Sequence, residues 1–380
     1  MRERFIHILT RLFSIFPIKN IILMESVPDY SDNTYSLYKE FLKKGINEKY
    51  TIIWIASSGI GDRNVYSIDN SSLIGIVKMC YFIAVSKVII SCNYVFKKYR
   101  KHQINIFLNH AITYKRIRDY YTLNNTIDYN IVTSLTTRKI MSFQQNFDIE
   151  KTFAVGFPRN DELFHSVNME NVLGKAYNKV IVWYPTFRQH KAAINIVSEG
   201  LEAIPLITNE GNAKQINELL ERYNICLVIK PHFAQDVSYI KNLNLSNILF
   251  ITDDFFKRSG ITSYEFVGNC DALLTDYSSI FIDYLLCDKP IGLIWSDKES
   301  YLKNPGLIDD YEYYARGTQK IYTLEELDKF ITNIACSIDL YKEERNSLKR
   351  EMHMVLTPNN SENVCNFIVT EIKKRDQSHD

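Results

Sequence analysis

The sequence has little glycine, little proline and no excess of charge of either sign. Its 380 residues include only 13 glycines and 9 prolines, without a biased tract or repeat, which argues against disorder and against a solenoid. Lys and Arg number 45 and Asp and Glu 44, so the composition does not indicate a nucleic-acid partner. The hydrophobic share of 46% is that of a globular chain, and the length predicts about two domains.

Cysteine motifs and the common phosphate-binding loops are also missing. The seven cysteines are scattered, with no C-x-x-C pair, so neither a zinc site nor a disulfide framework is indicated. A reducing, cytoplasmic setting fits this pattern. No ligand cluster suggests a metal, no cofactor is predicted, and a metal requirement is left open. Neither the Walker lysine motif nor G-x-G-x-x-G occurs, so a phosphate site here needs another design.

The N-terminal segment, residues 1–19, has the pattern of an amphipathic helix that ends before Pro17. Its apolar residues fall on one helical stripe, whereas Arg4, His7 and Arg11 lie off it. The stripe consists of Phe5, Ile8, Leu9, Leu12, Phe13 and Phe16. Both a helix docked on its own domain and a helix lying on a membrane surface fit this pattern. No apolar run reaches the roughly 18 residues of a spanning helix, and no signal-peptide cleavage site follows.

Short apolar runs alternate with helical patterns along most of the chain, which is typical of parallel sheets covered by helices on both faces. The predicted strands are 20–24, 50–56, 87–91, 104–110, 129–134, 151–156, 179–185, 225–231, 247–252, 272–277 and 290–295. So many strands favour two Rossmann-like α/β domains, at 20–165 and 166–340, with closing helices and a polar tail at 341–380. Thr323 is a candidate N-cap for a predicted helix over 322–335.

Several of the predicted strands end in polar residues, and open α/β sheets bind ligands at the carboxyl ends of their strands. The first half contributes His110. The second half contributes Thr186 with Arg188, Lys230 with His232, and Asp276 with Ser278 and Ser279. Together these endings predict a site in a cleft between two domains.

Each candidate also has a plain structural interpretation. His232 follows Pro231, which fixes its direction beside Lys230, and this favours a functional role. Arg188 has the shape for bidentate phosphate contact but fits a surface arginine equally well. His110 likewise fits either role, with Lys115 and Arg116 adding local positive charge.

Ser278 and Ser279 stand where a helix is predicted to begin. A plain N-cap needs only one hydroxyl. Two hydroxyls, with Asp276 before them and Asp283 one turn later, favour a helix start that binds an oxyanion.

Four motifs resemble those of the CDP-glycerol glycerophosphotransferase family, which includes teichoic-acid primases and polymerases. They are "VGFPRNDELF", "VWYPTFR", "IKPHF" and "TDYSSIFIDYLLCDKPI", in this order. "SDNTYSLYKEF" and "EKYTIIWI" are similar to the family's N-terminal part, so the resemblance covers about residues 21–335. It implies a GT-B fold, with two parallel sheets facing a central cleft, and a CDP-glycerol or CDP-ribitol donor. It also implies a lipid-linked or glycan acceptor and peripheral action at the cytoplasmic face of the cell membrane.

The resemblance also implies roles for individual residues. His110 matches the general base, and His232 matches a second essential histidine near the donor diphosphate. Ser278 and Ser279 match the serines of the donor phosphate site. Arg188 and Lys230 are expected to bind the diphosphate as well, and the supporting residues are Thr186, Asp276, Asp283 and Lys115. Asp276 and Asp283 are the next candidates for the base. The family's first histidine usually stands in Trp-His-Gly-Thr-Pro-Leu-Lys, whereas this chain reads "NHAITYK".

Three functions are compatible with these observations. The first is transfer of glycerol phosphate or ribitol phosphate from a CDP-alditol to an acceptor hydroxyl in teichoic-acid or capsule synthesis, with CMP leaving. The second is a GT-B sugar transferase with a nucleotide-sugar donor, or a nucleotide-sugar 2-epimerase. The third is a non-catalytic scaffold in an envelope-polymer assembly complex, which the altered "NHAITYK" motif keeps open.

Overall fold

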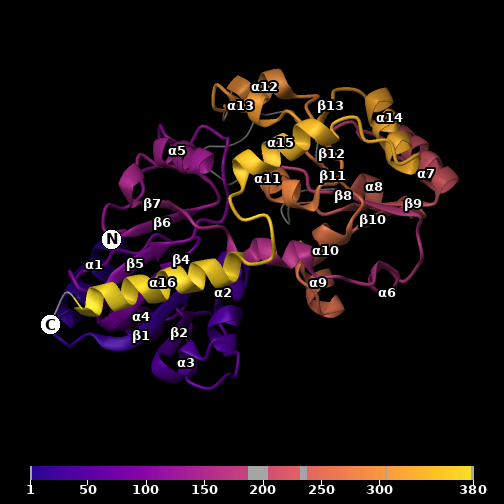
Figure 1. The fold of residues 1–380 in the computed structure, drawn as a ribbon. Helices are drawn as coiled ribbons and strands as arrows, with labels where there is room; N and C mark the ends of the chain where they lie inside the picture. Colours follow the sequence, from indigo (N-terminus) through magenta and orange to yellow (C-terminus); the bar gives the residue numbers. More distant parts are fainter. Residues whose placement is uncertain (1, 187–203, 232–237, 304–305, 378–380) are drawn as a thin grey trace. The chain divides into compact units, whose positions relative to one another are not determined.

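A computed structural model describes residues 2–186, 204–231, 238–303 and 306–377. Its contacts divide the chain into two compact units (Figure 1). The first unit comprises Met1–Ile112, Ile117–Asp161 and Met352–Asp380, and the second comprises Thr113–Arg116 and Glu162–Glu351. The chain therefore crosses between the units several times.

The described part of the first unit contains a seven-stranded parallel sheet with the order β3-β2-β1-β4-β5-β6-β7. Its strands are β1 (Lys19–Glu25), β2 (Thr51–Ile55), β3 (Val65–Ile68), β4 (Ser86–Ser91), β5 (Ile104–Phe107), β6 (Tyr129–Val132) and β7 (Thr152–Ala154). β1, β2, β4 and β5 are largely buried, as expected for parallel strands covered on both faces. The strand order reverses between β1 and β4, and a ligand crevice is expected outside the carboxyl ends at such a switch point.

Helices cover this sheet. They are α1 (Arg2–Phe13), α2 (Asp32–Lys43), α3 (Ile46–Lys49), α4 (Leu73–Val85), α5 (Leu135–Gln144) and α16 (Asn360–Gln377), with the short 3-10 turn η1 (Ile149–Lys151). α16 comes from the end of the chain and lies beside α2 (Figure 1). Val364, Cys365, Ile368 and Ile372 from α16 share a buried cluster with Leu37 and Phe41 from α2. The C-terminal segment is thus part of the first unit's core.

The N-terminal helix α1 is docked on the first unit and also keeps an exposed apolar side. Ile6 and Phe13 pack against a buried cluster that includes residues of α4, and the Phe13 and Tyr81 rings meet edge to face at 5.6 Å. Other apolar side chains of the predicted stripe point to solvent: Phe5 is 45% exposed, Ile8 59% and Leu12 61%. One face of the helix therefore buries its apolar side chains in the unit, whereas the other exposes them to solvent.

The described part of the second unit contains a six-stranded parallel sheet with the order β10-β9-β8-β11-β12-β13. Its strands are β8 (Lys179–Trp183), β9 (Ile225–Ile229), β10 (Ile248–Phe250), β11 (Ala272–Thr275), β12 (Ile291–Ile294) and β13 (Gln319–Ile321). The order reverses between β8 and β11, which places the switch point of this sheet between those two strands.

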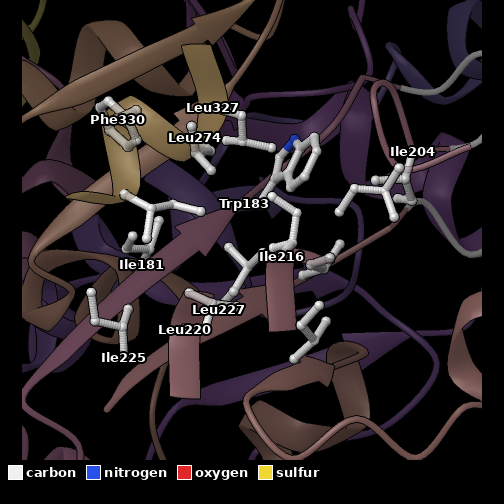
Figure 2. Close-up of a cluster of buried hydrophobic side chains, with 14 of the residues drawn as sticks. Ile181, Trp183, Ile204, Ile216, Leu220, Ile225, Leu227, Leu274, Leu327 and Phe330 are labelled. Atoms are coloured by element: carbon white, nitrogen blue, oxygen red, sulfur yellow. The ribbon is translucent and has the colours of Figure 1, made fainter. Parts of the chain in front are cut away.

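The second unit's helices are mostly short. They are α6 (Met169–Leu173), α7 (Glu210–Tyr223), α8 (Ser238–Lys241), α9 (Asp253–Ser259), α10 (Ser263–Asn269), α11 (Ile280–Tyr284), α12 (Lys298–Lys303), α13 (Tyr311–Tyr314), α14 (Leu324–Ala335) and α15 (Lys342–Met352), with 3-10 turns η2 (Pro158–Phe164) and η3 (Leu285–Cys287). Both η2 and α15 run across a boundary between the units. Figure 2 shows the core on one face of the sheet, where Trp183 and Leu274 of the strands meet Ile216 of α7 and Leu327 of α14.

The α/β fold class with two parallel sheets is confirmed, and each predicted strand has a counterpart in the structure. The helix at 322–335 is α14, and Thr323 caps it, accepting a hydrogen bond from Glu326 N at 3.3 Å. β3 and β13 were not predicted. Both are short strands at a sheet edge with partly exposed residues, so they lack the continuous apolar run that marks a buried strand.

Candidate functional site

His110 stands just beyond the carboxyl end of β5 in the first unit. The strand ends at Phe107, three residues earlier than the predicted run, and Asn109 adopts a left-handed backbone with φ 58°. The His110 side chain is exposed, while its backbone oxygen accepts a hydrogen bond from Arg159 Nη1 at 2.5 Å. An exposed imidazole on an anchored backbone is what a general base at a strand end requires.

Glu25 ends β1 at the switch point of the same sheet. It is 1% exposed, and its Oε2 accepts hydrogen bonds from Asn93 N at 3.2 Å and Tyr94 N at 3.1 Å, directly after β4. Burial is the largest influence and raises the pKa of this carboxyl to about 7, although the two backbone N–H groups lower it. Sequence reasoning missed Glu25, because it reads as the last residue of an apolar strand.

Lys115 was predicted to add positive charge beside His110, but the contacts place the two residues in different units. Residues 113–116 form a short tether in the second unit, where Lys115 makes an antiparallel bridge with Leu307. Tyr114 is buried there and stacks on Tyr314, with ring centroids 5.4 Å apart and planes at 7°. The proposed charge effect of Lys115 on His110 stays a prediction.

Thr186 and Asp276 meet across the switch point of the second sheet, after β8 and β11 respectively. The Asp276 carboxylate accepts hydrogen bonds from Thr186 N at 3.0 and 2.9 Å and from the Thr186 hydroxyl. It also accepts from Tyr277 N at 2.6 Å, and Asp276 is 0% exposed. Asp276 therefore joins the two strand ends and is shielded from any acceptor, which argues against it as the base.

Ser278 and Ser279 precede α11 and are partly exposed. Ser279 is the N-cap residue, yet its side chain makes no capping hydrogen bond. Within the described part of the chain, the structure shows no hydrogen bond from the hydroxyl of either serine. The plain capping interpretation is thus not what the structure shows, and both hydroxyls remain available for a ligand.

Asp283 lies on α11 and is buried, with 2% of its surface exposed. Its Oδ2 accepts a hydrogen bond from the Tyr264 hydroxyl at 2.7 Å, which ties α11 to α10. This contact indicates a structural role for Asp283 at the start of the helix. The expectation that Asp283 replaces His110 as the base is not favoured by its burial.

Lys230 directly follows β9 in the second unit. Its Nζ pairs with Asp253 at 3.0 Å and lies 5.8 Å from the ring centroid of Tyr184. The Lys230 side chain is 22% exposed and that of Asp253 63%, so the pair is open to solvent on one side. Arg188 and His232, the other predicted diphosphate residues, lie outside the described residues.

The sequence also missed a buried polar stretch in the first unit and at its boundary. Arg159, Asn160 and Asp161 of "VGFPRNDELF" are 5%, 0% and 9% exposed. Asp161 accepts hydrogen bonds from Asn360 N and Ser361 N, both at 2.8 Å, and so fixes the start of α16. The available signal was the run of polar and charged residues itself. Such residues are rarely buried unless they are paired, so a buried run indicates specific partners elsewhere in the chain.

Metal-binding clusters and membrane-spanning helices are both absent from the described residues. No group of three or more His, Cys, Asp and Glu in them is arranged to hold a metal ion. Among the helices that the structure describes, none combines the length and apolarity of a membrane span.

The two parallel sheets with their covering helices form a GT-B-like fold. The chain belongs to the family of CDP-Glycerol:Poly(glycerophosphate) glycerophosphotransferases, whose family model matches residues 8–370. The resemblance inferred from the motifs is thereby confirmed. The family is one of transferases.

Known relatives support the same assignment. The teichoic acid poly(ribitol-phosphate) polymerase of Bacillus spizizenii is 25% identical over 86% of this chain, which spans 55% of that polymerase. The teichoic acid glycerol-phosphate primase of Bacillus subtilis is 22% identical over 74% of this chain and 76% of its own. The solved structure of the wall teichoic acid polymerase TagF superposes with a TM-score of 0.73, covering 96% of this chain and 94% of that one at 20% identity. At that identity the structural likeness shows the fold alone.

Proposed function

We propose that the protein transfers a glycerol-phosphate or ribitol-phosphate unit from a CDP-alditol to a hydroxyl of a lipid-linked or glycan acceptor in wall-polymer synthesis. The observation that carries the proposal is the second unit's switch point, where Asp276 joins Thr186 to the loop that bears Ser278 and Ser279. A crevice at a switch point is where open α/β sheets bind nucleotides. Membership of the glycerophosphotransferase family supports a CDP-alditol in that place.

In the proposed reaction the acceptor oxygen attacks the alditol-bearing β-phosphorus, and the bond from that phosphorus to the CMP oxygen breaks. His110 takes the proton of the attacking hydroxyl, a contribution of roughly 10²–10⁴-fold in rate. The negative charge that develops on the departing CMP is stabilised by hydrogen-bond donors and cations. We assign that task to Lys230, Arg188 and His232, together with the hydroxyls of Ser278 and Ser279.

Thr186, Asp276 and Asp283 support this donor side without touching the donor. The hydrogen bonds from Thr186 to Asp276 fix the chain two residues before Arg188. The bond from Tyr264 to Asp283 fixes α11, whose first turn follows Ser279. Preorganised supports of this kind reduce the cost of ordering the site around the ligand.

We also propose that α1 holds the protein against the inner face of the cell membrane. The exposed apolar side chains of α1 support this, because a helix that buries one face in its unit and exposes apolar residues on the other resembles interfacial helices. A surface hollow beside α1 is lined by Arg11, Lys97, Lys98 and Arg100. Basic residues next to an apolar face favour anionic lipid headgroups.

A donor screen with the purified protein tests the transfer. CDP-glycerol, CDP-ribitol and UDP-sugars are offered with a lipid-linked acceptor, with and without EDTA, and released nucleotide and product mass are measured. We expect CMP release with a CDP-alditol, an acceptor heavier by one alditol phosphate or more, and loss of turnover in His110→Ala with donor affinity retained. UDP release would instead indicate a sugar transferase or a 2-epimerase, and donor binding without turnover would indicate a scaffold.

A further inference from the structure

Three buried amide side chains of the first unit form a closed ring of hydrogen bonds beside His110. Asn109 Nδ2 donates to Asn130 Oδ1 at 2.7 Å, and Asn130 Nδ2 donates to Gln145 Oε1 at 2.8 Å. Gln145 Nε2 donates to Asn109 Oδ1 at 2.7 Å and so closes the ring. The three residues are 2%, 0% and 3% exposed. Because every amide in the ring both donates and accepts, each has one favoured orientation.

The ring connects the end of β5 with the beginning of β6 and the end of α5. Asn109 follows β5, Asn130 belongs to β6, and Gln145 caps the end of α5. Asn109 Nδ2 also donates to the Ile131 backbone oxygen at 2.7 Å, which pins the residue to the neighbouring strand. The backbone of Asn109 is thus held in its left-handed conformation, φ 58°, by its own side chain.

Two further side chains hold the backbone on either side of the link between Asn109 and His110. Asn33 Nδ2 donates to the Asn109 oxygen at 2.8 Å, and Arg159 Nη1 donates to the His110 oxygen at 2.5 Å. These two residues are themselves joined, since Arg159 N donates to Asn33 Oδ1 at 3.2 Å. Arg159 Nη1 also pairs with Asp32 at 2.7 Å. Two successive backbone carbonyls are therefore fixed by buried side chains from distant parts of the chain.

These hydrogen bonds restrain the backbone of Asn109 and His110 more tightly than packing of the core alone requires. A buried polar network is usually no more stabilising than well-packed apolar side chains of similar volume. What such a network adds is a single defined conformation of the backbone that it holds. Here that backbone leads directly into His110, whose side chain is exposed. A ring of this kind at the end of β5 has a function if the reaction requires one direction of the His110 imidazole.

We propose that Asn109, Asn130, Gln145 and Arg159 are positioning residues that hold the His110 imidazole in line with the acceptor hydroxyl. The inference rests on the proposed function, because it takes His110 as the general base. A base acts only within hydrogen-bond reach of its proton, and a displacement of about 1 Å can cost roughly 10²-fold in rate.

A pair of matched glycine variants tests the role of the ring. Asn109→Gly keeps the left-handed backbone and deletes the amide, and Asn64→Gly does the same at another residue with φ 58°, outside the proposed site. We expect Asn109→Gly to lower kcat about 10- to 100-fold, with donor affinity within twofold of the wild type. Asn64→Gly should leave both unchanged. Thermal melting shows that each variant is folded at the assay temperature.

Gln145→Met provides a second variant, in which the ring is broken while side-chain volume is nearly kept. Nuclear magnetic resonance of histidine-labelled protein supplies a readout that does not depend on turnover. The His110 signal is identified as the one lost in His110→Ala. We expect it to be a single narrow signal in the wild type and to broaden or split in Asn109→Gly and Gln145→Met, with the other histidine signals unchanged.

The outcomes separate this inference from the proposed function. Loss of turnover in His110→Ala together with normal kcat in both folded ring variants would overturn the positioning role alone. Normal turnover in His110→Ala would overturn the base assignment and the inference with it. If the wild type turns over no CDP-alditol, the proposed function fails, and an unchanged His110 signal in both variants would then overturn the positioning role as well.

Discussion

Asp276 accepts hydrogen bonds from both the backbone N–H and the hydroxyl of Thr186, and so joins the ends of β8 and β11 at the switch point of the second sheet. A carboxylate that also accepts from Tyr277 N has little capacity left for a ligand. Its role is to hold the two strand ends in register. We therefore expect the residues on either side of this contact, rather than Asp276 itself, to face a donor.

Replacing Asp276 should therefore reduce stability as well as donor binding. In Asp276→Ala the buried N–H and hydroxyl groups of Thr186 lose their partner, and we expect the free energy of unfolding to fall by about 3 kcal/mol. Thr186→Val removes only the hydroxyl bond and should cost roughly 1–2 kcal/mol. Urea unfolding measures both. Equal stability of Asp276→Ala and the wild type would show that the contact is not maintained in solution.

The serines before α11 should behave in the opposite way. Neither hydroxyl is used as a cap, so Ser278→Ala with Ser279→Ala should leave the free energy of unfolding within about 0.5 kcal/mol of the wild type. Donor affinity should fall at least tenfold. Thr323 is the matched control, because it caps α14 with a capping box. Thr323→Ala should cost about 1 kcal/mol of stability and leave donor affinity unchanged. Calorimetry that finds unchanged donor affinity in the serine variant would show that neither hydroxyl binds the donor.

Lys230 and Asp253 allow a test of charge competition. Their side chains pair at 3.0 Å, and a donor diphosphate bound by Lys230 would compete with the Asp253 carboxylate. Asp253→Asn should therefore raise donor affinity by about two- to fivefold, whereas Lys230→Met should lower it about tenfold or more. Both effects should weaken with added salt, because the pair is partly exposed. Binding titrations in which Asp253→Asn weakens the donor would contradict this arrangement.

The elements that the sequence predicted correctly share one property. Each is marked by a pattern among residues that are close together in the chain. Apolar runs without polar alternation mark the buried strands, and Thr323 followed by Glu326 marks a capped helix, because the residues that make each structure are neighbours in the chain. The strand-end rule likewise identified Thr186 and Asp276 as a group. The sequence could not show that these two bond to one another across 90 residues.

Long-range partners explain what was missed. The amide ring unites Asn109, Asn130 and Gln145, whose polar side chains look like ordinary loop or strand-edge residues when read along the chain. Glu25 looks like the polar end of a strand, and only its burial at the switch point gives it an unusual pKa. The start of α16 is fixed by Asp161, which accepts a hydrogen bond from a residue 199 positions later in the chain.

Glu25 should make stability depend on pH. Its pKa is raised from 4.5 to about 7 in the folded state, mainly by burial, so between these values the folded protein holds a proton that the unfolded chain has released. The stabilising contribution of this proton is complete below about pH 4.5, declines as the pH rises, and is lost above about 7. The total is on the order of 3 kcal/mol.

Urea unfolding of the wild type and Glu25→Gln between pH 4.5 and 8 measures this contribution, because glutamine does not titrate. We expect the free energy of unfolding of the variant, relative to the wild type, to rise by that amount across the range. Parallel pH curves for the two proteins would mean that Glu25 is not buried as the structure shows.

The exposed side of α1 includes Leu12, which is 61% exposed. If this side lies in a membrane surface, Leu12→Glu should lower the partition onto anionic liposomes about tenfold or more, since it removes a buried leucine and adds a repelled charge. Leu135 on α5 is 63% exposed and serves as the matched control, so Leu135→Glu should change partition little. Binding of the wild type should also weaken with salt, because Arg11 and its basic neighbours act through screened attraction. Equal sedimentation of Leu12→Glu and Leu135→Glu with the liposomes would exclude α1 as the membrane contact.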